Sequence, residues 1–208
     1  MMVNSLQSMG IRIASLCAVG GMLLLGGCES DQDEAAMDGM HSHMATDMVT
    51  PKQSGRTMFS HEDIMFAEMM IPHHQQAIEM ADLVPSRSQN LQVKALAAQI
   101  KDAQQPEIDL MQSWVDSSGS GDMAHMVGSA PMDGMLSESE LAKLRAARGV
   151  AFDRRFLQGM IAHHEGAILT ATPLRTSGTA EVAKLTTAIV ESQTADIARM
   201  RELLATLP

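Results

Sequence analysis

The sequence predicts an all-α protein, namely a four-helix bundle built from two copies of one helical hairpin. The first observation is an internal repeat, because residues 66–78 and 156–168 each carry a tandem histidine pair in the same apolar setting, 90 positions apart. The match continues at an offset of 89 between residues 93–111 and 182–200. A long repeat that carries two helical patterns indicates a duplicated hairpin. Since neither hairpin can bury its own apolar face, the two are expected to pack together.

Helix boundaries follow from the apolar spacing and from residues that begin or end helices. Ser60 and Ser137 are placed as N-caps, and the second, with a glutamate three residues later, starts a short helix over residues 141–148. Pro72 is expected to kink the first long helix and Pro85 to end it. The four long helices are predicted near residues 61–84, 90–115, 151–172 and 179–204.

The N-terminus has the features of a bacterial export signal. Arg12 is the only charged residue before an apolar run over residues 13–25, which is too short for a confident membrane span. The run ends in Leu-Gly-Gly-Cys, which resembles a lipobox and predicts cleavage before Cys28 and its acylation. Cys17 lies in the leader, so the mature chain keeps a single cysteine and forms no internal disulfide. We expect an exported, periplasmic protein that is anchored in the membrane by lipid, with an ordinary signal peptide as the alternative.

The predicted organisation has three parts. Residues 1–27 form the lipoprotein signal peptide, 28–59 a flexible tether, and 60–208 the four-helix domain. Within the domain, repeat 1 covers 60–115, a linker 116–136, and repeat 2 137–204.

Charge and aromatic content exclude one class of partner. The chain has 15 Lys and Arg against 25 Asp and Glu, a formal net charge of −10, no Tyr and one Trp. Nucleic-acid binding needs cations for the phosphates and aromatic rings for the bases, and both are scarce here. An acidic envelope protein is better suited to binding cations.

The tether and the linker are rich in methionine and histidine, where no core is expected to bury them. Thioethers are soft ligands that select Cu(I) or Ag(I), and imidazole accepts Cu(I) and Cu(II) alike. The alternative is a low-complexity segment that drifted toward methionine. The candidate ligands in these segments are Met37, Met40, His41, His43, Met44, Met48, Met123, His125, Met126, Met132 and Met135.

Polar residues interrupt the apolar stripes of the second and fourth long helices. Gln104 and Glu107 stand in one stripe, and Gln193 and Asp196 hold the same places in the other. Buried amides and carboxylates need partners, and the histidine pairs lie on the adjoining helices. One interpretation is a structural layer of hydrogen-bonded imidazole, carboxylate and amide groups. The other is a metal site, and the sequence leaves both open.

Helical geometry limits how the histidines can point. Adjacent residues on a helix point about 100° apart, so at most one histidine of each pair is expected to face inward, by the spacing His73 and His163. His74 and His164 are then expected on the flank. A methionine stands three residues before the first histidine of each pair, so sulfur and imidazole share a face. The candidate metal ligands on the helices are therefore Met70, His73, His74, Glu107, Met160, His163, His164 and Asp196. Because a ligating imidazole must be deprotonated, copper affinity is expected to fall as the pH drops through roughly 6.5.

The two repeats resemble the DUF305 family, and the similarity covers about residues 60–204. Matching residues in the first copy are Phe66, Met70 to His74, Ala77, Ile78, Met80, Ala81, Gln104, Glu107 and Ile108. In the second copy they are Phe152, Asp153, Phe156, Leu157, Met160, Ile161, His163 to Ile168, Gln193, Asp196 and Ile197. The resemblance implies an exported protein of ferritin-like helical architecture, and some members are associated with copper.

The second copy departs from the family pattern at three positions. Ala162, Thr170 and Asp196 stand where the first copy has a proline, a methionine and a glutamate. If one copy alone binds metal through its helices, we expect it to be the first.

The leading hypothesis is a non-enzymatic envelope protein that sequesters or delivers copper, and also silver, with a copper-transfer protein or a second copy of the chain as partner. One alternative is a metal-free scaffold or adaptor lipoprotein. Another is a ferritin-like metallo-oxidase, which would need Glu-x-x-His motifs on its helices. No glutamate stands three residues before any of the four helical histidines, which disfavours the oxidase.

Overall fold

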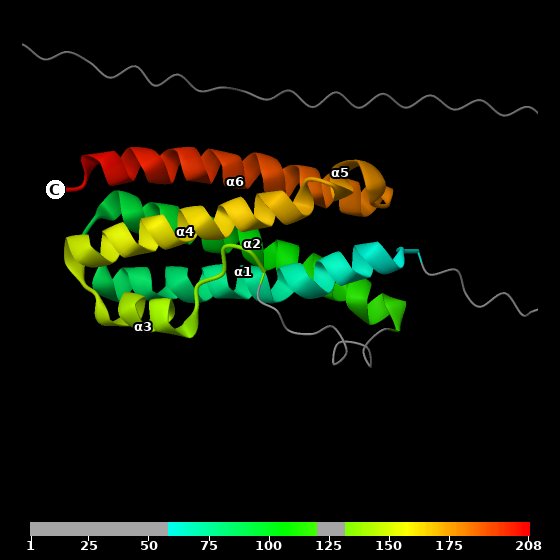
Figure 1. Ribbon diagram of the computed structural model, residues 1–208, viewed down its shortest axis with the longest axis horizontal. Helices are drawn as coiled ribbons and strands as arrows, with labels where there is room; N and C mark the ends of the chain where they lie inside the picture. The colour runs from blue at the N-terminus through cyan, green and yellow to red at the C-terminus, as the bar shows by residue number, and fades with distance from the viewer. Residues whose placement is uncertain (1–57, 120–131) are drawn as a thin grey trace, which may run out of the picture. The chain divides into compact units, whose positions relative to one another are not determined.

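A computed structural model of the chain describes residues 58–119 and 132–208. The leader, the tether up to residue 57, and residues 120–131 of the linker lie outside these ranges. The described residues form helices and no strand, so the all-α prediction is confirmed (Figure 1). The helices are α1 (His61–Arg87), α2 (Leu91–Ser118), α3 (Glu138–Ala146), α4 (Gly149–Ala171), α5 (Leu174–Ser177) and α6 (Ala180–Thr206).

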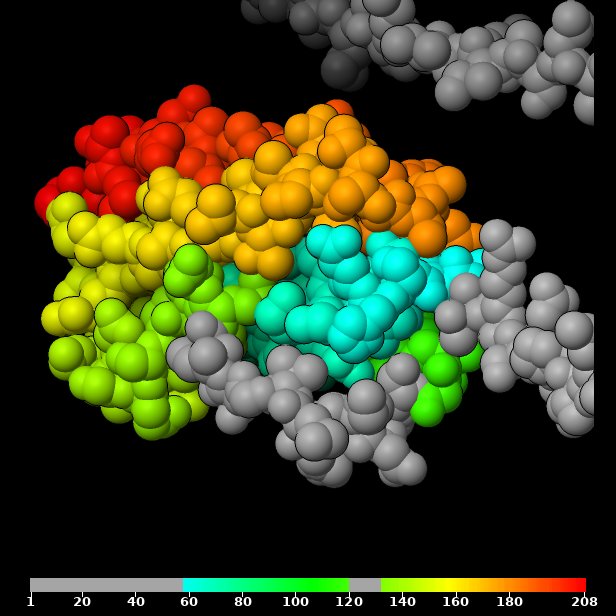
Figure 2. All heavy atoms as spheres, turned by 45° about the vertical axis from the view of Figure 1, so that its right-hand side comes forward, coloured from blue at the N-terminus to red at the C-terminus, as the bar shows by residue number. Residues whose placement is uncertain are grey.

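Two antiparallel hairpins make up the bundle. α1 packs mainly on α2 and α4 mainly on α6, and the hairpins meet chiefly along α1 and α4. Figure 1 shows α1 and α4 side by side and running in opposite directions. In Figure 2 the cyan surface of α1 lies directly against the yellow and orange surface of α4. Two equivalent hairpins that meet in this way are related by an approximate twofold axis through the contact between α1 and α4, which we call the seam.

A buried carboxylate fixes the start of α1 and joins it to the second hairpin. Asp63 forms a capping box with Ser60, in which Ser60 Oγ accepts from the Asp63 amide (3.1 Å) and Asp63 Oδ2 accepts from the Ser60 amide (2.9 Å). Asp63 Oδ1 accepts from the Thr179 amide (3.3 Å), just before α6. Ser137 and Glu140 form the second capping box, which begins α3 three residues earlier than predicted.

The packed domain begins earlier than its predicted boundary. Phe59, which was assigned to the tether, is 5% exposed, and its ring centroid lies 5.2 Å from that of Trp114. Phe59 precedes the N-cap, and Ile64, at the fourth helical position, belongs to the same apolar cluster. This arrangement is a hydrophobic staple, which fixes the direction in which the chain enters α1.

Proline interrupts the long helices less than the sequence predicts. α1 contains both Pro72 and Pro85 and continues to Arg87, so the predicted end at residue 84 is wrong. Each proline removes one backbone hydrogen bond. Val84 is fully buried directly before Pro85, so packing of the last turn against the core offsets that loss.

The core consists of two apolar clusters at opposite ends of the bundle. One is formed by the second half of α1, the first half of α2, the first half of α4 and the end of α6, together with α3. The other is formed by the first half of α1, the end of α2, the second half of α4 and the first half of α6. The polar residues lie between these clusters in each of the four long helices. They are the histidine pairs of α1 and α4, Gln104 and Glu107 of α2, and Gln193 and Asp196 of α6. Over residues 58–119 and 132–208, no helix is long and apolar enough to cross a membrane.

Candidate metal centre

All four helical histidines lie in the layer between the two apolar clusters, and each is fully buried. His73 of α1 and His163 of α4 meet across the seam, with ring centroids 3.7 Å apart and planes tilted by 34°. Within each pair the two rings are 6.3 Å apart and tilted by 52°, the same values in both halves. The duplication predicted from the repeat therefore extends to side-chain geometry.

The predicted flank position of the second histidines is wrong. His74 and His164 are as buried as their neighbours, because a helix in a bundle has two packed sides rather than one. His74 Nε2 lies 2.8 Å from Oε2 of Glu107 on α2, and His164 Nε2 lies 3.6 Å from Oδ2 of Asp196 on α6. The first histidine of each pair faces the other hairpin, and the second faces its own.

The imidazoles are short of hydrogen-bond partners. Seven of their eight ring nitrogens have none among the described residues, the exception being Nε2 of His74. Gln104 Oε1 and both side-chain polar atoms of Gln193 also lack a hydrogen-bond partner among the described residues. Buried polar atoms in folded proteins are almost always paired, so such a concentration calls for a specific explanation. The hydrogen-bonded structural layer is thus incomplete within the described part of the chain.

Burial lowers the pKa of three of the four imidazoles, which favours their neutral form. Desolvation, followed by the neighbouring His74, lowers the pKa of His73 from 6.5 to about 3, although the main chain of Asp133 partly opposes this. Desolvation and the adjoining histidines hold the pKa of His163 well below 6.5. Desolvation also lowers the pKa of His164, against the opposing effect of Asp196. Neutral imidazole has the lone pair that metal ligation requires.

Two buried methionines lie one helical turn before the histidine pairs. Met70 and Met160 are fully buried, one in each apolar cluster, and each is one helical turn before its histidine pair. The described residues contain no group of three or more His, Cys, Asp or Glu side chains placed to hold a metal ion.

The two halves differ at the carboxylate. Asp196 is one methylene shorter than Glu107, and it stands correspondingly farther from its histidine. Its Oδ1 accepts a hydrogen bond from Gln99 Nε2 of α2 (3.1 Å), which draws it toward the other hairpin. The residue that corresponds to Gln99 in the second half is Ala188, so Glu107 has no equivalent neighbour.

The end of the linker crosses the seam directly over the histidines, and we call residues 132–136 the strap. Both polar atoms of the Gln76 side chain bind the Leu136 main chain, with Nε2 donating to the carbonyl (3.0 Å) and Oε1 accepting from the amide (2.7 Å). Gly134 has a φ of 83°, and a Cβ there would lie 2.2 Å from the carbonyl oxygen of Ala162. A Cβ on Gly166 would lie 1.7 Å from the carbonyl oxygen of Asp133. The strap is thus fastened to α1 and seated against the α4 backbone.

Sequence reasoning missed Gln76 and Gly166 as site residues. The available signal was a glycine within a helix, where it is less favourable than alanine by roughly 1 kcal/mol and usually has a packing reason. Sequence reasoning also placed all the linker methionines away from any core, and Met132 contradicts this. Met132 is half-buried and packs against one apolar cluster, while Met135 is half-buried in the strap. The remaining candidates lie outside the described residues, namely Met37, Met40, His41, His43, Met44, Met48, Met123, His125 and Met126.

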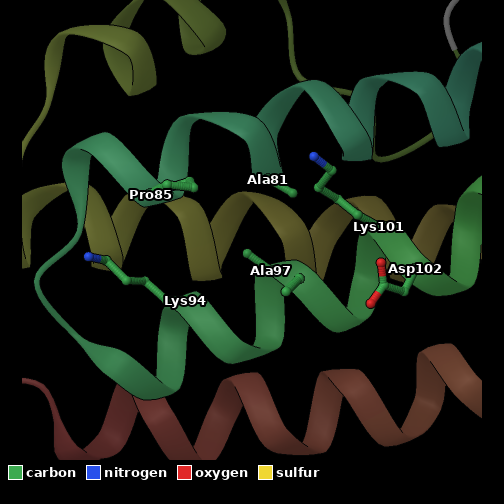
Figure 3. Close-up of a pocket in the computed structure, with 7 residues that line it drawn as sticks. Ala81, Pro85, Lys94, Ala97, Lys101 and Asp102 are labelled. Carbon is green, nitrogen blue, oxygen red and sulfur yellow. The ribbon is translucent and has the colours of Figure 1, made fainter.

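A separate surface groove lies between α1 and α2 (Figure 3). It has a volume of about 190 Å³, a floor of alanines from both helices, and Lys94 and Lys101 at its sides. Lys101 pairs with Asp82. None of the four histidines lines this groove, so it is no part of the candidate centre.

Fold and site together define an all-α protein of two paired helical hairpins with a buried histidine centre at their seam. The chain belongs to the DUF305 family, because the family described as "Domain of unknown function (DUF305)" matches residues 63–204. The resemblance noted from the histidine repeats is therefore confirmed.

Solved structures of several relatives are similar. A DUF305 protein of Streptomyces coelicolor, described as secreted, is 32% identical, with a TM-score of 0.63 over 69% of this chain and 92% of its own. A DUF305 fragment of Deinococcus radiodurans is 30% identical, with a TM-score of 0.62 over 72% and 99%. CopM in its Cu(I)-bound form is 34% identical, with a TM-score of 0.57 over 68% and 94%, and it was also crystallised with Ag and with Cu(II). Among curated proteins none matches.

Proposed function

We propose that this protein binds copper in the cell envelope, and silver by the same chemistry, and so sequesters the ion or hands it on. The observation that carries the proposal is the layer of four fully buried imidazoles, in which seven of the eight ring nitrogens lack a hydrogen-bond partner among the described residues. Leaving so many polar atoms unpaired in a core is unfavourable by roughly 1–3 kcal/mol each. A bound ion would supply the missing partner.

The choice of metal rests on the donor atoms. Imidazole from His73 and His163, together with thioether from Met70 and Met160, forms a soft ligand set. Such a set favours Cu(I) and Ag(I) over Zn(II) and Fe(II). The similarity to CopM, which was crystallised with Cu(I), Cu(II) and Ag, supports the same choice.

The methionines of the tether and the linker would form a second, weaker class of site. Ordering such a segment on binding would offset part of the ligand energy, so exchange there should be fast. The histidines stand on packed helices and lose little freedom, so binding there should be tighter. Ions captured by the thioethers could pass to the histidines, or to a partner protein.

Export and lipid anchoring are part of the proposal. They are supported by the Leu-Gly-Gly-Cys junction at Cys28 and by the Streptomyces relative described as secreted. Methionine is a suitable soft ligand in an oxidising envelope, because it forms no disulfides.

The test is a titration of the full chain with Cu(I), without oxygen, against a colorimetric Cu(I) chelator. The double variant His73→Ala, His163→Ala should lose the tight sites, while leucine at Met123 and Met126 of the linker should lower only the weak class. His61→Ala is the matched control, since this histidine is exposed at the start of α1. If the double variant folds, as far-UV circular dichroism would show, and keeps the tight sites, the histidine layer is structural.

A further inference from the structure

We infer that Glu107 is a positioning residue, which keeps the proton of His74 on Nε2 and so makes Nδ1 the atom that binds the metal. The inference rests on the proposed function, because it adds His74 to the ligands proposed for the histidine layer. It applies to the first half of the protein and fails in the second, so the two halves should bind unequally.

The hydrogen bond fixes the tautomer. Glu107 Oε2 lies 2.8 Å from Nε2 of His74, while Nδ1 of His74 is buried and unpaired among the described residues. A carboxylate oxygen accepts this hydrogen bond, so Nε2 of His74 is the donor, and in the neutral form of the ring the single proton is on Nε2. Nδ1 then carries the lone pair.

This arrangement is that of a carboxylate behind a metal-binding histidine. A hydrogen bond from the distant ring nitrogen to a carboxylate orients the ring and makes the other nitrogen more basic. Oε2 of Glu107 is already engaged by Nε2, and the side chain is 16% exposed, at the outer side of the layer. Glu107 therefore contacts one ring nitrogen of His74, and the unpaired nitrogen is on the other side of the ring. A carboxylate placed in this way would act on a metal ion through the histidine, without touching the ion.

The second half lacks an equivalent short hydrogen bond between carboxylate and histidine. His164 Nε2 is 3.6 Å from Asp196, and both of its ring nitrogens are unpaired within the described ranges. Oδ1 of Asp196 is held instead by Gln99. At 3.6 Å, Asp196 holds the proton on Nε2 less firmly than Glu107 does in the first half, so we expect His164 to be a mixture of tautomers and to bind the ion more weakly.

The metal-free protein offers the first readout. In ¹⁵N-labelled full chain, the ring ¹⁵N shifts should show His74 as the Nε2–H tautomer and His164 as a mixture. Glu107→Gln keeps an acceptor oxygen and should keep the tautomer, whereas Glu107→Ala should lose it. Glu165→Ala, which removes an exposed carboxylate paired with Arg201, is the control and should change neither ring. An unchanged His74 tautomer in Glu107→Ala would overturn the inference, whatever the copper result.

The metal-loaded protein offers the second readout. With Ag(I), the coupling between silver and ¹⁵N should appear at Nδ1 of His74, and coupling at Nε2 would overturn the inference. Glu107→Ala should weaken binding about 10- to 100-fold, as expected for the loss of an indirect partner, and Glu107→Gln should recover part of it. Wild-type affinity in Glu107→Ala would equally contradict a positioning role. If the wild-type chain binds neither copper nor silver, the proposed function fails, and the tautomer result then stands as a structural finding alone.

Discussion

Gln76 and Gly166 occupy the same position in the two halves of the protein, and they hold opposite sides of the strap. Gln76 binds the Leu136 main chain through both of its side-chain polar atoms. Gly166 has no side chain, which lets the Asp133 carbonyl lie against α4. One strap crosses an approximately twofold seam, so the two positions cannot carry the same residue.

Replacing Gly166 by alanine should therefore destabilise the protein. In an ordinary helix interior this change stabilises by about 1 kcal/mol. Here the new Cβ would lie 1.7 Å from the Asp133 carbonyl oxygen, so either the strap must lift or α4 must shift. We expect a loss of about 1–3 kcal/mol in the free energy of unfolding, measured by urea denaturation.

Gly159→Ala, in the same helix, is the matched control. Its Cβ would meet side-chain ends of Leu136 at 3.3 Å and of Met80 at 3.4 Å, which can move by a few tenths of an ångström. This variant should be neutral or slightly more stable. Equal effects of the two substitutions would mean that the strap does not depend on Gly166.

Stability should fall as the pH is lowered from about 6.5 to about 3. Unfolded His73 takes up a proton near its ordinary pKa of 6.5, whereas the folded residue, with a pKa of about 3, does not. The unfolded state binds more protons in this window, so the free energy of unfolding rises with pH by about 1.4 kcal/mol per pH unit for each such histidine. The lowered pKa values of His163 and His164 act in the same direction.

The measurement is urea unfolding at several pH values, followed by the fluorescence of buried Trp114. His73→Leu should show a shallower pH dependence than wild type, by about one proton, and an identical slope would contradict the assignment. The same pKa revises an expectation from the sequence. Proton competition at His73 should be displaced far below pH 6.5, so copper affinity at this residue should be nearly constant through that value.

Asp63 should be worth more to stability than an ordinary helix cap. Its carboxylate serves both the Ser60 amide in its own hairpin and the Thr179 amide in the other. Asp63→Ala should lower the free energy of unfolding by about 1–3 kcal/mol, since buried amides then lose their partner. Glu62→Ala, an exposed acidic neighbour in the same turn, should change it by less than about 0.5 kcal/mol in thermal or urea unfolding.

Lipid anchoring at Cys28 has a direct test. Cys28→Ser in the full-length protein should move it from the membrane to the soluble fraction of fractionated cells, since the acyl chains supply the membrane affinity. Inhibition of lipoprotein processing should leave an uncleaved precursor. Unchanged membrane partitioning of the variant would refute the anchor.

The sequence was most informative about features that depend on a single helix, such as which face of the helix a side chain lies on. The 3.6-residue period correctly placed His73 and His163 on the inward face, although it did not predict that they meet across the seam. It misplaced His74 and His164, because the spacing describes one packed stripe, whereas each helix here has two packed neighbours. The contacts of the strap could not be predicted from the sequence, for a different reason. The approach of Gly134 to Ala162 joins residues from two elements, and no periodicity encodes such a contact.

A centre formed by His73 and His163 at a twofold seam has a consequence for how such a protein can arise. A single hairpin that associated with a second copy of itself would already bring two equivalent imidazoles face to face. Fusing the copies into one chain keeps that pairing and adds a connecting segment. Once joined, the copies are free to diverge, so one half can keep a glutamate at position 107 while the other carries an aspartate at position 196. Ancestral or engineered half-length chains could thus be metal-binding homodimers in their own right.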